Sequence, residues 1–132
     1  MQLSFGGGGL NTPDGFTMEG GRGIYRAVGA VTLDEAVARV RAAIAAARSN
    51  QAADLLVDIT ALVGFPSPDT FQRFLAAVAW AEEAAGRLRL AMIARVEMID
   101  RERFGVTVAA NRGLKSNIFS TEADARAWLD AK

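Results

Sequence analysis

The stretch that decides the fold is LLVDITALVGFPSPDT, residues 55–70. Its first part is an apolar run that Asp58 alone interrupts, a pattern typical of a strand covered on both faces of a parallel sheet. Its last part signals a helix start, because Ser67 suits the N-cap, Pro68 the first helical position and Asp69 the first turn. The stretch therefore predicts a buried strand, a short apolar loop and a helix.

The sequence on either side alternates between strand and helix patterns. Thr32 and Glu35 form a capping box, and apolar residues then recur at helical spacing to about Arg48. The order ββαβαβαβα predicts an α/β fold with about four helices and a mixed, mainly parallel sheet of about five strands, whose opening hairpin is an antiparallel edge. We expect strands over residues 16–19, 24–31, 54–59, 88–94 and 117–119, and helices beginning at Thr32, Ser67, Asp100 and Ser120 or Thr121.

Length and charge bound the class of protein. A chain of 132 residues is one ordinary domain, which we expect over residues 16–131, with the glycine-rich residues 1–15 as a flexible entry. The 15 basic and 15 acidic residues cancel, so no global field would attract nucleic acid. Basic residues outnumber acidic ones by seven to three between Arg87 and Lys115. Such a cluster is a solvated face or a site for polyanions.

The residue types that are missing exclude several kinds of chemistry. The chain has no Cys and no His, so we exclude disulfides, thiol or imidazole catalysis and the usual zinc sites. No metal or cofactor is expected. The N-terminus lacks the pattern of a secretory signal, and the longest apolar stretch, residues 74–81, is too short to span a bilayer. We therefore expect a cytoplasmic protein without stable membrane insertion.

The element order, together with LLVDITALVGF, resembles the STAS family of sulfate-transporter and anti-sigma-factor-antagonist domains. The family's apolar strand ends in Asp-x-Ser/Thr, as Asp58-Ile59-Thr60 does, and Asp-Ser-Ser-Gly-Leu opens its next helix. The C-terminal part looks still more like a bacterial SpoIIAA-like subgroup of uncharacterised proteins, in a short strand ending in Phe119 and a helix carrying Glu122, Ala125, Trp128 and Leu129. The resemblance covers roughly residues 16–131 and implies a STAS-like fold with a regulatory role.

The chain departs from the STAS pattern at the regulatory serine. In the best register Pro68 occupies that position, and Ser67 precedes it. A phosphate on Ser67 would be favoured by the helix N-terminus and opposed by the adjacent Asp69. Two interpretations stay open: Ser67 is a phosphorylation site, or it is simply an N-cap and the phosphoserine switch is absent.

Candidate binding residues gather at one edge of the expected sheet. Ligands of open α/β sheets bind beyond the carboxyl ends of the strands. Phe65 and Met98 either line a shallow groove there, together with Val63 and Ile99, or fold under the loop as satellite core. Asp58 either accepts hydrogen bonds from loop amides or acts as an acid or base with a raised pKa. The full candidate set is Asp58, Thr60, Phe65, Ser67, Arg95 and Met98.

A second candidate surface lies on the helix that follows residue 67. Apolar residues define its expected core stripe, and Trp80 falls almost opposite Phe71 at 100° per residue. Trp80 is then either a contact residue for a homodimer or partner, or it is covered by the N-terminal segment. The expected core stripe is Phe71, Phe74, Leu75 and Val78, and the expected contact surface is Arg73, Ala77, Trp80 and Ala84.

Three functions compete. The leading hypothesis is a non-enzymatic protein-interaction or regulatory module, whose partner is another protein or a second copy. The alternative is a protein that binds a small apolar or anionic, lipid-like molecule in the groove at the strand carboxyl ends. An enzyme is the third, relying on Asp58, Thr60, Arg95 and Glu97.

Overall fold

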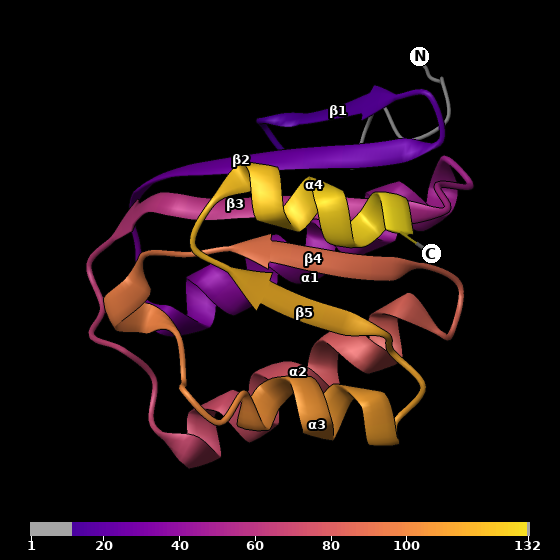
Figure 1. The fold of residues 1–132 in the computed structure, drawn as a ribbon. Coiled ribbons are helices and arrows are strands. Elements are labelled where there is room, and N and C mark those ends of the chain that lie inside the picture. Colours follow the sequence, from indigo (N-terminus) through magenta and orange to yellow (C-terminus); the bar gives the residue numbers. More distant parts are fainter. Residues whose placement is uncertain (1–11, 132) are drawn as a thin grey trace.

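The computed structural model describes residues 12–131 and has one sheet whose five strands follow chain order (Figure 1). β1 pairs antiparallel with β2, and all other neighbours are parallel. The predicted order ββαβαβαβα is confirmed, with one short 3₁₀ helix (η1) added. The strands are β1 Phe16–Glu19, β2 Arg22–Ala30, β3 Asp54–Val63, β4 Arg89–Ile93 and β5 Ser116–Phe119. The helices are α1 Leu33–Ser49, α2 Thr70–Ala84, η1 Val96–Met98, α3 Phe104–Asn111 and α4 Glu122–Ala131.

The helices cover the two faces of the sheet unequally. When parallel strands follow one another in sequential order and all their crossovers have the same hand, the connecting helices lie on one face of the sheet. Accordingly, α1, α2 and α3 share one buried cluster with the sheet. α4 follows β5 and lies across the opposite face, as Figure 1 shows. α2 is the outer member of the larger layer, since it packs mainly on α1 and α3.

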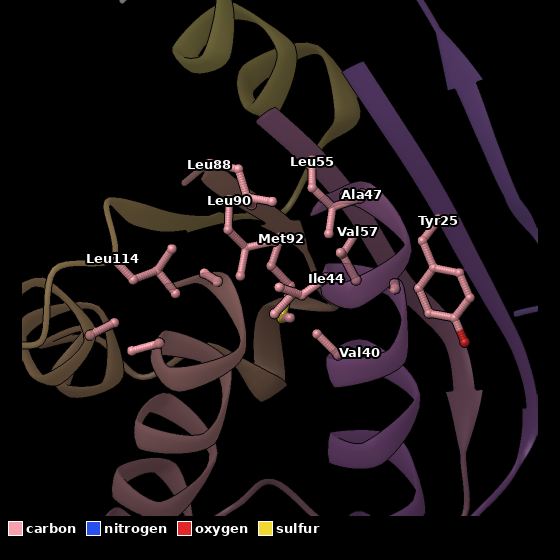
Figure 2. Packing of buried hydrophobic residues seen from close by; sticks show 14 of the residues in the cluster. Tyr25, Val40, Ile44, Ala47, Leu55, Val57, Leu88, Leu90, Met92 and Leu114 are labelled. Atoms are coloured by element: carbon pink, nitrogen blue, oxygen red, sulfur yellow. The ribbon is translucent and has the colours of Figure 1, made fainter. Parts of the chain in front are cut away.

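β3 is the centre of both cores, as its continuous apolar run predicts. Leu55 and Val57 point to the three-helix side, where Figure 2 shows them facing α1, whereas Leu56 points to the α4 side. All three side chains are fully buried. Burying each such side chain contributes roughly 1.5–3 kcal/mol. The strand therefore ties together the two layers of helices.

The predicted start of α2 is wrong by two residues. Asp69, not Ser67, is the N-cap: its side chain accepts from the Gln72 N–H at 2.8 Å, and the Gln72 side chain accepts from the Asp69 N–H at 2.8 Å. Pro68 disfavours helical geometry at the residue before it, which keeps Ser67 outside the helix. Ser67 is exposed.

Two other boundaries differ from the expectation by three residues or more. β3 continues to Val63, so Thr60 and Val63 belong to a strand rather than a loop, because β2 pairs with β3 again after an irregularity between Arg26 and Val28. α3 begins only at Phe104, although Asp100 does accept the Phe104 N–H at 2.8 Å, because η1 and a turn occupy the preceding residues.

Charged contacts fasten α4 to the sheet. Arg22 pairs with Asp54 at 2.8 Å and with Asp130 of α4 at 2.7 Å. Arg26 donates to both carboxylate oxygens of Glu122, at 2.8 and 3.1 Å. At the other end of the helix, Arg89 donates to the carbonyls of Trp128 and Leu129 and lies 4.3 Å from the centre of the Trp128 ring. These contacts fix α4 over a small core.

The Glu122 cluster predicts a loss of stability in acid. Hydrogen bonds from Arg26 and then Arg126 lower the pKa of Glu122 from its usual 4.5 to about 2. Because the folded-state pKa is depressed, the stabilisation is full above pH 4.5 and is lost as the pH falls towards 2. Glu122→Gln should lower the free energy of unfolding by about 1 kcal/mol at pH 7, since the cluster is partly exposed. Urea unfolding at pH 7, 4 and 2.5 should show this difference shrink, and a constant difference would contradict the assignment.

The capping box of α2 gives a second prediction. Asp69→Ala should lower the free energy of unfolding by about 1 kcal/mol, because the Gln72 N–H loses its acceptor. Ser67→Ala should change it by less than about 0.5 kcal/mol, since Ser67 is exposed and outside the helix. Urea unfolding of the two variants beside the parent measures both changes. A larger loss of unfolding free energy for Ser67→Ala than for Asp69→Ala would show that Ser67 is the N-cap, as the sequence predicts.

Candidate functional site

A cavity of about 130 Å³ lies between the sheet and α2. Its walls are side chains of β3, β4 and β5 on one side and of α1, α2 and α3 on the others. Gln72 and Arg103 also line it and are exposed, so the cavity reaches the surface on their side. The apolar walls include Val37, Val40, Ile59, Phe65, Ala76, Ala77, Trp80, Leu90, Met92, Met98, Val106 and Ile118.

The cavity follows from the small residues of α2. Every buried residue of this helix is alanine, at positions 76, 77, 81 and 84. Methyl side chains are short, so they allow α2 to pack closely on α1 and α3, while Ala76 and Ala77 line the same cavity as Leu90 and Met92 of the sheet. Space is therefore left beneath the helix, where Trp80 is the largest side chain that α2 contributes.

Trp80 points inward, so its predicted place on the outer face of the helix is wrong. Its indole Nε1–H donates to the Val37 carbonyl of α1 at 3.1 Å, and its ring packs against the main core. Ala77 and Ala84 are buried with it, at 4% and 0% exposure. Conversely, Phe71 and Leu75 of the expected core stripe are 66% and 51% exposed. Phe74 and Val78, the other two residues of the stripe, are partly buried and pack against the main core. α2 is therefore turned so that its small residues and its tryptophan face the protein together with Phe74 and Val78, whereas Phe71 and Leu75 do not.

The two apolar candidates at the strand ends belong to this cavity. Phe65, half-buried in the connection from β3 to α2, and Met98, buried in η1, both line it. They come from connections that follow neighbouring parallel strands, as the rule for strand carboxyl ends predicts. Trp80, Ala77 and Arg73, which were assigned to a separate surface, line the same cavity. Sequence reasoning missed their convergence because it placed them on the outer face.

Asp58 and Thr60 lie on the other face of the sheet. Asp58 accepts the Thr60 N–H at 2.9 Å and the Thr60 hydroxyl at 2.7 Å, and it is 3.4 Å from Arg26. The Asp58 carboxylate thus accepts hydrogen bonds from nearby groups of the chain, as one of its two interpretations from the sequence predicts. Its neighbours are the charged residues that fasten α4, Arg26 and Glu122. The predicted binding set is therefore divided between two faces.

Ser67 and Arg95 contribute less to a site than expected. The Ser67 hydroxyl accepts from Arg73 Nη2 at 2.8 Å, and its displacement from the N-cap removes the helix-terminus argument for a phosphate there. Arg95 Nε lies 3.3 Å from Glu97, its neighbour in η1. The cluster of basic residues is also dispersed: Arg89 begins β4 and Lys115 precedes β5 at one edge of the sheet, whereas Arg95 follows β4 at the other.

Three charged residues line the cavity: Arg73, Asp100 and Arg103. Arg73 donates to the Met98 carbonyl at 3.2 Å as well as to Ser67, and Arg103 donates to the Ile118 carbonyl at 2.9 Å. The pKa of Asp100 lies below its usual value, mainly because the carboxylate accepts a hydrogen bond from the Phe104 N–H. The hydrogen bond from the Glu102 N–H and the charge of Arg73 lower this pKa further. The arrangement offers apolar walls and guanidinium donors, which are groups that bind rather than transfer protons.

Residues 12–131 contain neither a metal-binding cluster nor a membrane-spanning helix. No group of three or more acidic, His or Cys side chains is arranged to hold a metal ion there. No helix in the same range is long and apolar enough to cross a membrane.

Comparison with known proteins gave no match. No protein-family model matches the chain, and no curated protein or solved structure is significantly similar to it. The resemblance to STAS proteins therefore stays a prediction from the sequence.

Proposed function

We propose that the protein binds a small molecule with an apolar body in the cavity beneath α2. The observation that carries the proposal is the cavity itself, about 130 Å³ with mainly apolar walls. A buried apolar cavity of about this size, roughly 150 Å³, is dry and binds benzene or xenon. It is smaller than the pockets of roughly 300 Å³ or more that hold drug-sized ligands. The ligand is thus expected to have a single ring or a short hydrocarbon chain.

The two tryptophans make this proposal testable in solution. Trp80 lines the cavity, whereas Trp128 lies on the opposite face under Arg89. Adding 1-hexanol to ¹⁵N-labelled protein should shift the indole Nε1–H signal of Trp80, because the ligand disturbs the surroundings of its bond to Val37. The Trp128 signal should stay in place. Trp80→Phe and Trp128→Phe variants assign the two signals.

A filled cavity supplies the matched control. Ala77→Leu places a larger side chain in the cavity and should weaken 1-hexanol binding at least about tenfold. Ala79→Leu makes the same change on the same helix at a position outside this cavity lining and should bind like the parent. Circular dichroism establishes that both variants are folded. Equal binding by the two variants, or no Trp80 shift with the parent, would contradict the proposed function.

A protein-interaction function is the second candidate, favoured by one observation. The large apolar side chains that are exposed in residues 12–131 gather at the carboxyl edge of the sheet, near strand ends and helix starts. An exposed apolar rim of this kind favours contact with another protein. A regulatory module of the STAS type would use such an edge for a partner or a second copy. The residues are Val28, Val63, Phe71, Leu75, Val96 and Phe104.

Self-association through this rim can be measured directly. Sedimentation velocity should show a dimer for the parent, and Phe71→Asp should shift it to monomer because Phe71 is 66% exposed on the rim. Ala127→Asp, on the exposed side of α4, is the control and should leave the dimer intact. A parent protein that stays monomeric at all concentrations would rule out the homodimer.

A further inference from the structure

We infer that the ligand of the cavity beneath α2 carries one anionic head group, such as a carboxylate, which Arg73 and Arg103 bind. The inference rests on the proposed function and names the chemical class of its ligand. The charges that line the cavity do not cancel: two guanidinium groups and one carboxylate line its otherwise mainly apolar walls. The cavity thus has an excess of one positive charge.

Arg73 keeps donors available for a ligand. Its guanidinium bridges two loops at the carboxyl edge of the sheet, donating to Met98 in one and to Ser67 in the other. Both partners are uncharged oxygens, so neither neutralises the cation. These bonds use two of the five N–H donors of arginine. The bridge also holds the side chain in a fixed position, which lowers the entropy lost when a ligand binds.

Arg103 is placed in the same way. Within residues 12–131 its guanidinium donates one hydrogen bond, to the Ile118 carbonyl of β5, another uncharged acceptor. Asp100 does not neutralise the two arginines through a direct bond, since its carboxylate accepts the Phe104 N–H at 2.8 Å and the Glu102 N–H at 3.4 Å. The carboxylate stays ionised, because these bonds lower its pKa.

These groups favour an anion over a neutral or cationic head group. Guanidinium groups bind carboxylates through paired, charge-assisted hydrogen bonds that are roughly twice as strong as neutral ones. Nearby apolar walls strengthen such bonds by lowering the local dielectric constant. An ammonium head group would instead meet the net positive charge. The short apolar tail would occupy the space beside Trp80 and Ala77, and the head group would lie towards the arginines.

Three probes with the same six-carbon chain separate charge from apolar contact: hexanoate, 1-hexanol and hexylamine at pH 7. Binding is followed by the Trp80 indole signal, with that of Trp128 as internal reference. Hexanoate should bind at least about tenfold more tightly than 1-hexanol, and hexylamine should bind most weakly. Arg73→Gln and Arg103→Gln should each reduce the preference for hexanoate to about threefold or less, with little change for 1-hexanol. Arg101→Gln removes an exposed cation that does not line the cavity and should keep the full preference.

The outcomes distinguish the two proposals. If 1-hexanol binds as tightly as hexanoate, or hexylamine binds most tightly, the inferred anionic head group is wrong and the proposed function stands. If none of the three probes shifts the Trp80 signal, the proposed function fails and the inference with it. If Arg101→Gln lowers the hexanoate preference as much as Arg73→Gln does, the selection comes from general charge, and the assigned role of the two arginines is overturned.

Discussion

The parallel pairing of β3 with both β2 and β4 is the constraint on which the rest of the structure depends. Because the strands follow one another in sequential order, crossovers of one hand bring three helices to one face. That face has room for α1 and α3 against the sheet, and α2 rests on those two helices. Its alanines allow this close packing and leave the space beneath it unfilled. The cavity is thus a consequence of topology together with the choice of small residues.

The carboxyl edge of the sheet has two faces of opposite character. On the α4 side, Asp58 accepts a hydrogen bond from Thr60 and pairs with Arg26, which in turn pairs with Glu122. The polar groups of these residues therefore already have partners within the protein. On the α2 side, apolar residues surround open space, and within residues 12–131 the guanidinium groups of Arg73 and Arg103 donate their hydrogen bonds to neutral oxygens. The groups that could still bind a ligand, namely the apolar walls and the guanidinium donors, therefore lie on the α2 side.

Much of the fold could be predicted because its signals are local. The apolar run of β3, the capping box of Thr32 with Glu35 and the cap of α4 at Thr121 each depend on residues close in sequence, and the structure has all three. The glycine-rich start, as far as residue 11, lies outside the described residues. The sequence predicts the N-cap of α2 at the wrong residue because Ser67-Pro68 and Asp69 offer competing signals. The three-residue spacing of Asp69 and Gln72 was the sequence signal that decides between them, and the structure forms this capping box.

The site was harder to predict because it depends on how α2 is rotated. Apolarity favours Phe71 and Leu75 as the buried stripe, but packing against two neighbouring helices selects the alanine face and the Trp80 hydrogen bond instead. The spacing of Ala77, Ala81 and Ala84 was the signal that could have revealed this. The sequence predicts a groove at Phe65 and Met98. It does not predict that Trp80 and Arg73 line the same cavity, because these residues come from a different element.

A crystal structure of the protein under xenon pressure tests the central claim most directly, because xenon occupies apolar cavities without needing a specific head group. We expect a xenon atom between Trp80, Ala77 and Met92, with α2 unchanged in position. A cavity closed by side chains, with no xenon beneath α2, would contradict it.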